Sequence, residues 1–94
     1  MIQLDSDNTE NKIKILGYLH KQKILHNRNQ VINEQLNRNE LRTKLKIDND
    51  EGKLHQPINE LVSQNFITQD DSNEPYRHAI TTDGEAVWRF FNPK

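Results

Sequence analysis

Apolar residues recur at helical spacing near the start of the chain. Five of them form one stripe: Ile13, Ile15, Leu16, Tyr18 and Leu19. Spacings of three and four residues place side chains on one face of a helix, which can pack on a core. The pattern predicts a core-facing helix over about residues 8–22, preceded by a disordered tail at residues 1–7.

The following segment, residues 23–35, is rich in Asn and Gln and shows no clear period. Its anchors are four apolar residues: Ile24, Leu25, Val31 and Ile32. We expect a long connection here, with or without a short strand or turn.

Two helices follow in close succession. Asn37 with Glu40 is an Asx form of the capping box, which predicts a helix start, and Asp48 with Glu51 repeats it. The first helix uses Leu41, Leu45 and Ile47 as its apolar face; the second, at about residues 50–64, uses Leu54, Ile58, Leu61 and Val62. Pro57 removes a backbone hydrogen bond, so we expect this second helix to bend or to begin its regular part near the proline.

The last third of the chain predicts a β-hairpin and a closing helix. Phe66 begins one strand, the polar run 70–75 forms a loop, and residues 76–81 return as the second strand. Thr82 with Glu85 is a T-x-x-E capping box, which predicts the start of a short last helix.

The predicted order is helix, long connection, helix, tight turn, helix, hairpin and helix. This is the arrangement of a winged helix-turn-helix domain, and residues 36–91 resemble the winged-helix domains of prokaryotic transcription regulators of the MarR, ArsR and PadR kind. Three motifs carry the resemblance. They are LNRNELRTKLKID for the first helix of the helix-turn-helix, EGKLHQPINELVSQNFI for the recognition helix and its exit, and YRHAITTDGEAVW for the second wing strand and the closing helix.

The motifs match the family pattern with small changes. Asn65 stands where the family's L-x-x-x-G-x-I exit usually has glycine, and asparagine also tolerates the left-handed conformation that ends a helix. Ile80, Thr82 and Gly84 follow the family's L-T-x-x-G pattern with one additional threonine. Two departures are the long insert after the first helix and the end of the chain soon after the closing helix, so long terminal dimerisation helices are not expected.

The resemblance implies an α+β fold, with a single winged-helix domain over residues 1–94. That domain would have a three-helix core, a two-stranded β-hairpin wing and a short C-terminal helix. In this family the recognition helix enters the major groove of double-stranded DNA, and the wing touches the backbone or the minor groove. Carried over, these roles fall on about residues 50–64 and on residues 66–81, and the implied function is sequence-specific DNA-binding transcription regulation.

The same resemblance implies ten candidate DNA-contacting residues. They are Arg38, Arg42, Lys44, Lys53, His55, Gln56, Asn59, Ser63, Arg77 and His78. Gln and Asn can pair bidentately with adenine, Lys can reach guanine acceptors, and cationic side chains can hold phosphates. Each of these residues is equally an ordinary polar residue of a solvated surface.

Charge is distributed unevenly although the net charge is only −1. Residues 12–47 carry nine Lys/Arg and two Glu, a sum of +7, whereas residues 48–75 carry seven acids and one Lys, a sum of −6. A basic segment can face an anionic partner, but acids beside the recognition helix and in the wing loop repel phosphate. A homodimer would place two basic segments on one duplex and so partly offset this repulsion. The alternative is a winged-helix protein–protein interaction module that reads no DNA.

The composition of the chain excludes several other classes of site and function. The chain has no cysteine, which excludes disulfides and Cys-ligated zinc. No apolar run is long enough for a membrane span and no signal peptide is visible, so a cytoplasmic location is expected. The four histidines are scattered, and there is no glycine-rich phosphate loop or nucleophile elbow. We therefore expect no catalytic site, metal or cofactor.

The aromatic residues of the last helix predict self-association. Trp88, Phe90 and Phe91 cannot all point inward from one short helix. We expect an oligomer interface that includes Trp88 and Phe91, and hence a homodimer.

Overall fold

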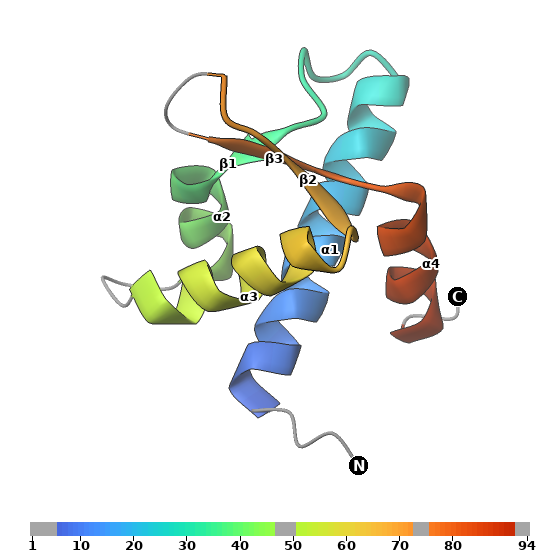
Figure 1. Cartoon of the computed structure of the whole chain (residues 1–94). Coiled ribbons are helices and arrows are strands. Elements are labelled where there is room, and N and C mark those ends of the chain that lie inside the picture. Colours follow the sequence, from blue (N-terminus) through green and yellow to red (C-terminus); the bar gives the residue numbers. More distant parts are fainter. Residues whose placement is uncertain (1–5, 47–50, 73–75, 92–94) are drawn as a thin grey trace.

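The computed structural model describes the backbone of residues 6–46, 51–72 and 76–91, and the side chains of residues 10–46, 54–72 and 76–91. Within these residues the chain has an α+β fold of four helices and a three-stranded antiparallel sheet (Figure 1). The elements are α1 (Ser6–Asn27), β1 (Leu36–Asn37), α2 (Arg38–Leu45), α3 (Glu51–Ser63), β2 (Ile67–Asp70), β3 (Arg77–Ile80) and α4 (Thr82–Phe91).

The helix α1 is the central element of the fold. It packs against α2, α3, α4 and β3, and Figure 1 shows it passing behind the sheet and α3. Ile15, Leu16 and Leu19 are at most 1% exposed, which confirms the predicted core-facing stripe at these positions, while Ile13 and Tyr18 are half-buried. The other members of this core come from every remaining element except α4: Leu36, Leu41, Leu54, Ile58, Leu61, Ile67 and Ile80.

The helix α1 is longer than the sequence predicted. It begins at Ser6, within the expected tail, and runs to Asn27 rather than ending near residue 22. The connection therefore spans residues 28–35 instead of 23–35. Of the expected disordered tail, residues 1–5 lie outside the described residues.

Two features are found at the added turns of α1, one tertiary and one local. Lys23 Nζ lies 3.0 Å from Glu85 Oε1 of α4, so the end of α1 has a partner on another helix. The helix ends at Asn27, and Asn29, two residues beyond it, has a φ of 59°. Gln30 N donates to Leu25 O at 2.9 Å and Asn29 N donates to the carbonyl three residues back at 3.0 Å, the bonds of a Schellman motif.

The sheet has the order β1–β3–β2. Strands β2 and β3 form the predicted antiparallel hairpin, with Ile67 opposite Ile80. The expectation of a two-stranded wing is incomplete, because β1 also pairs with β3 and sets Leu36 opposite His78. A strand of two residues is too short to display an alternating pattern, so the sequence carried no signal for it.

The start of α2 follows the prediction. Asn37 Oδ1 accepts from Glu40 N at 2.8 Å, and Glu40 Oε1 accepts from Asn37 N at 3.1 Å, which completes the capping box. The predicted cap at Asp48 and the role of Ile47 lie outside the described residues.

The helix α3 is continuous from Glu51 to Ser63 although it contains Pro57. No separate turn precedes the proline, which is itself buried. Leu54, Ile58 and Leu61 are at most 3% exposed, as their spacing predicts, and Val62 is half-buried.

The start of α4 differs from the prediction by one residue. Thr81 Oγ1 accepts from Gly84 N at 3.0 Å, so Thr81 caps the helix, and Thr82 is its first residue. Glu85, expected to complete the capping box, instead lies beside Lys23 of α1. None of the helices in the described part of the chain has both the length and the apolar character that a membrane span needs.

Candidate nucleic-acid interface

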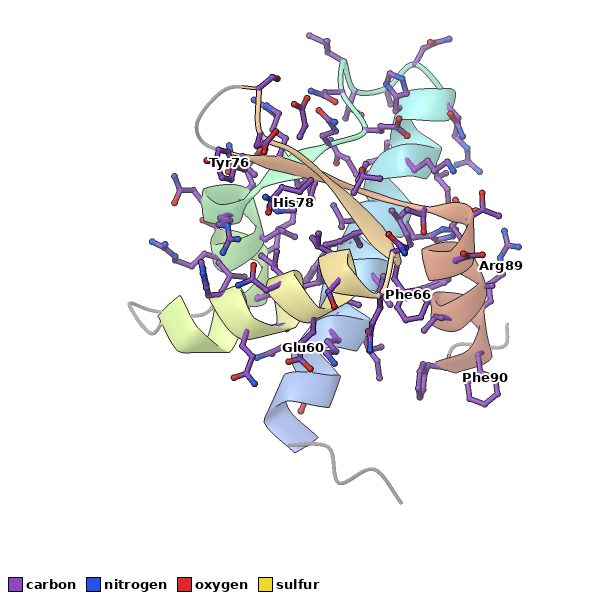
Figure 2. All side chains as sticks on the ribbon, viewed as in Figure 1. Glu60, Phe66, Tyr76, His78, Arg89 and Phe90 are labelled. Atoms are coloured by element: carbon purple, nitrogen blue, oxygen red, sulfur yellow. The ribbon has the colours of Figure 1, made fainter. Side chains whose placement is uncertain are left out.

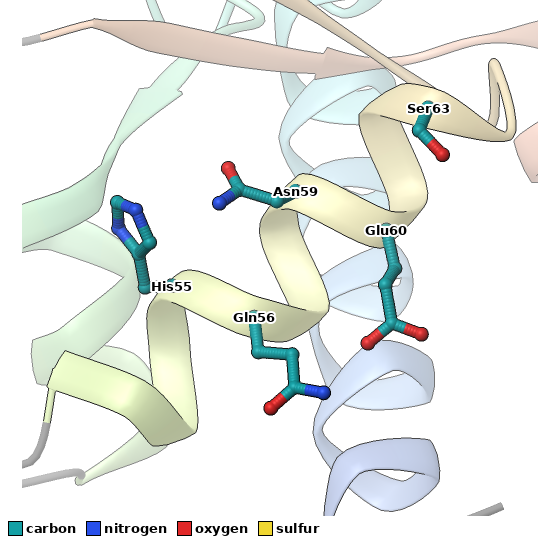
Figure 3. Close-up of a pocket in the computed structure, with 5 residues that line it drawn as sticks. All are labelled: His55, Gln56, Asn59, Glu60 and Ser63. Carbon is teal, nitrogen blue, oxygen red and sulfur yellow. The ribbon is translucent and has the colours of Figure 1, made fainter.

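The outer side of α3 is a strip of polar side chains. Because the apolar side of this helix is buried in the core, the opposite side faces solvent. Four predicted DNA contacts lie there and are exposed: His55, Gln56, Asn59 and Ser63 (Figure 3). Together with Glu60 they line a shallow hollow of about 370 Å³. The described residues that line the hollow all belong to α3, and an open surface of this kind suits a macromolecular partner better than an enclosed small molecule.

Arg38 connects the start of α2 to this outer strip of α3. Its Nη1 contacts His55 Nδ1, and its Nη2 donates to Asn59 Oδ1 at 3.3 Å. The structure therefore brings three of the ten predicted contacts into one hydrogen-bonded group. No local pattern relates Arg38 to residues 17 and 21 positions further along, so only the tertiary fold produces this group.

The strip also holds an ion pair that the sequence analysis missed. Lys12 Nζ lies 3.0 Å from Glu60 Oε1, and the Lys12 side chain is only 12% exposed. Helical spacing from Gln56 would have placed Glu60 on this face, but only the fold brings α1 beneath it. The ammonium group offsets the carboxylate charge that would otherwise face an anionic partner.

Arg77 lies at the start of β3, close to the start of α2. It is opposite Asn37 in the sheet, and its Nη1 is 3.9 Å from Glu40 Oε1, with both side chains more than 40% exposed. Exposed pairs at such distances contribute little to stability. Arg77 can therefore turn from Glu40 to a phosphate at small cost.

The described end of the hairpin is acidic. Asp70 Oδ1 accepts from Ser72 Oγ at 2.6 Å and from Ser72 N at 3.1 Å. These hydrogen bonds, the hydroxyl's first, hold the pKa of Asp70 below its usual value, because they favour the ionised carboxylate. Asp71 beside it is exposed, and Glu74 lies outside the described residues. Two carboxylates at this end would repel a DNA backbone.

A DNA contact by His78, expected from the sequence, is not compatible with its burial. The side chain is 0% exposed, and Figure 2 shows it beneath the sheet beside α2. Its Nε2 bonds Gln69 Oε1 at 3.1 Å on the neighbouring strand. Burial, with a smaller contribution from the Arg38 charge, lowers the pKa of His78 from 6.5 to about 4. His78 is therefore a neutral core residue of the sheet.

The remaining predicted cations have different surroundings. Arg42 is half-buried on α2. Lys44 faces α1, since its Nζ lies 5.9 Å from the ring centroid of Tyr18 and Tyr18 Oη donates to Lys44 O at 2.9 Å. Lys53 belongs to α3, but its side chain lies outside the described residues.

The aromatic residues of α4 divide into an inner one and two outer ones. Trp88 is half-buried against α1, where it stacks on His20 at a ring separation of 4.5 Å. Phe90 and Phe91 are 80% and 50% exposed and lie edge to face. Figure 2 shows Phe90 projecting from the end of α4. The exposed aromatic surface of this helix thus consists of Phe90 and Phe91, while Trp88 already has partners within the chain.

In the described part of the chain, no three His, Asp or Glu side chains form a group that could hold a metal ion. The outer strip of α3 presents the neutral donors and acceptors of His55, Gln56, Asn59 and Ser63 together with the paired Glu60, and Arg38 lies beside it. Comparisons with protein-family models, curated proteins and solved structures found no match to this chain.

Proposed function

We propose that this chain is a winged-helix protein that binds double-stranded DNA as a transcription regulator. The observation that carries the proposal is the outer strip of α3, which is polar and exposed while the opposite side of the helix is anchored in the core. A helix of this kind fits the major groove. The element order and the β1–β3–β2 sheet support the assignment, because they give three helices with a hairpin beside them.

The residues divide into two roles under this proposal. Gln56, Asn59 and Ser63 reach base edges from α3, which carries the sequence information. Arg38 and Arg77, beside that helix, hold phosphates and set its position on the duplex. The pairing of Glu60 with a lysine removes part of the charge that would oppose this approach.

A protein–protein interaction module is the second candidate. The observation that favours it is the exposed pair Asp70 and Asp71 at the described end of the hairpin, where a DNA-binding wing needs cations. In that case the outer strip of α3 would contact a protein surface, and the acidic hairpin would meet a basic one.

Retention on random-sequence duplex DNA separates the two candidates. The DNA-binding protein should be retained at about 50 mM salt, with an affinity that falls steeply as salt rises. Arg77→Ala should reduce the salt slope by about one unit. Arg89→Ala is the matched control, since it removes the same charge from α4, and Figure 2 shows Arg89 at the opposite edge of the molecule from Tyr76, the residue before Arg77. If the protein is not retained on duplex DNA, the DNA-binding proposal is contradicted and the protein–protein interaction module is favoured.

A homodimer is part of the proposal. Phe90 and Phe91 form an exposed aromatic pair at the end of α4, and two copies joined there would present two α3 helices to neighbouring half-sites. Sedimentation of the wild type should show a dimer, and Phe90→Ser with Phe91→Ser should give a folded monomer. A wild type that stays monomeric at all concentrations would contradict this part.

A further inference from the structure

Arg38 is the donor in its contacts with His55 and Asn59 of α3. A guanidinium group carries N–H donors only and stays protonated in proteins. His55 Nδ1 must therefore accept, which makes the ring neutral with its proton on Nε2. Asn59 must turn Oδ1 toward Arg38, which leaves its NH₂ group for other partners. Arg38 thus sets the orientation of two groups that can otherwise face either way.

Because Arg38 occupies the acceptor atoms of His55 and Asn59, these two residues present hydrogen-bond donors to solvent on the outer strip of α3. In the major groove, guanine presents two adjacent acceptors, O6 and N7, whereas adenine presents one acceptor, N7, and one donor, N6. An asparagine whose Oδ1 is directed to an arginine is poorly placed for the bidentate pair with adenine. The Nε2–H of His55 and the NH₂ of Asn59 match guanine instead.

We propose that Arg38 is a specificity-determining residue, which holds His55 and Asn59 by their acceptor atoms and so makes α3 select guanine over adenine. This inference rests on the proposed DNA binding. Arg38 needs no contact with a base for this role, because it acts through the two residues that it orients.

The orientation of His55 can be measured without DNA. Nitrogen NMR of the ring should show His55 with its proton on Nε2 at pH 8, and Arg38→Met should shift the ring toward a mixture of the two neutral forms. Methionine keeps an aliphatic stem at this position and removes the donors. A wild-type ring with its proton on Nδ1 would overturn the inference.

The effect on base preference is measured by selection from a randomised duplex library. The wild type should enrich guanine over adenine at the positions read by His55 and Asn59, and Arg38→Met should shift this ratio toward adenine by about tenfold. Arg42→Met is the matched control, because it removes the same charge from the same helix without touching either residue's acceptor contact. It should weaken retention and leave the ratio unchanged.

A second variant covers the case in which Arg38→Met does not fold. Asn59→Asp keeps an oxygen for Arg38 and replaces the outward donor by an acceptor, so it should lose the guanine preference in favour of cytosine, whose N4 donates. If the wild type is retained on DNA but both variants keep its base preference, this inference is overturned and the proposed DNA binding is not. A wild type that is not retained on any duplex would overturn the proposed function together with it.

Discussion

A methyl group placed on Gly84 would lie 2.0 Å from the carbonyl oxygen of Phe66. That oxygen belongs to the backbone between α3 and β2, and it accepts from Thr81 N at 3.0 Å. The first turn of α4 is therefore pressed against the start of the hairpin. Glycine is required here by the lack of space, since its φ is not in the left-handed region.

Gly84→Ala should lower the free energy of unfolding by about 2–3 kcal/mol, because a backbone atom cannot move aside as a flexible side chain can. Urea denaturation measures the change. Ala86→Gly on the exposed side of α4 is the control and should cost about 1 kcal/mol through helix propensity alone. A Gly84→Ala protein as stable as the wild type would show that α4 is not packed in this way.

The end of α3 gives a second stability prediction. Asn65 has a φ of 63°, and Phe66 N donates to Leu61 O at 3.0 Å across it. Asn65→Gly should stabilise the protein by about 0.5–1 kcal/mol, and Asn65→Ala should destabilise it by about 1 kcal/mol, because a side-chain Cβ is strained in this conformation. Thermal unfolding measures both. Gln64→Gly, one residue earlier with ordinary backbone, should destabilise instead; equal effects at the two positions would contradict the prediction.

Much of the fold was predictable because its signals are local. The stripe containing Leu54 and Ile58, the Asn37 capping box and the left-handed Asn65 each depend on residues within one or two turns. The start of α4 was harder to predict, because Thr81 and Thr82 are adjacent and either could cap the helix. Packing decides between them: Thr81 caps the helix when Gly84 lies against Phe66.

The candidate site was predictable only in part. Helical spacing placed Asn59 and its neighbours on one exposed face, but the partners of that face come from distant segments, as Lys12 does for Glu60. Strand alternation correctly grouped His78 with Ile80. It did not say which face is inside, and β1, which pairs with the histidine's strand, gave no signal of its own.

Burial of His78 predicts a dependence of stability on pH. The pKa of His78 is about 4 in the folded chain and 6.5 when free of burial, so between these values the unfolded chain binds the extra proton. The contribution of neutral His78 to the free energy of unfolding is therefore fully present above pH 6.5. It is lost as the pH falls toward 4 and does not change further below that pH. The loss is on the order of 3 kcal/mol.

Urea denaturation at pH 7.5 and pH 4.5 tests this, with His78→Leu as the variant that removes the group. Gln69, which is half-buried, can turn to water in that variant. Gln64→Leu, at an exposed site without a titrating group, is the control and should keep the wild-type pH dependence. Asp70, whose pKa is lowered, titrates below this interval. The same pH dependence in His78→Leu and in wild type would show that the histidine is not buried neutral.

The ion pair beneath the outer strip predicts an indirect effect on DNA binding. Lys12 is only 12% exposed, so it is poorly placed to touch a duplex itself. Lys12→Met should nevertheless weaken retention on DNA by several-fold, because it removes a positive charge that offsets the Glu60 carboxylate near the phosphates. Glu60→Gln should strengthen retention by a similar factor.

The double variant Lys12→Met with Glu60→Gln distinguishes this mechanism from a general loss of positive charge. If Lys12 acts by offsetting Glu60, then Lys12→Met should have little effect once the carboxylate is gone, and the two changes should be non-additive. If Lys12 instead contributes only to net charge, each change should keep its full effect in the double variant. Salt titration of retention supplies the comparison, and additive effects of the two substitutions would rule out the coupling of α1 to the outer strip of α3.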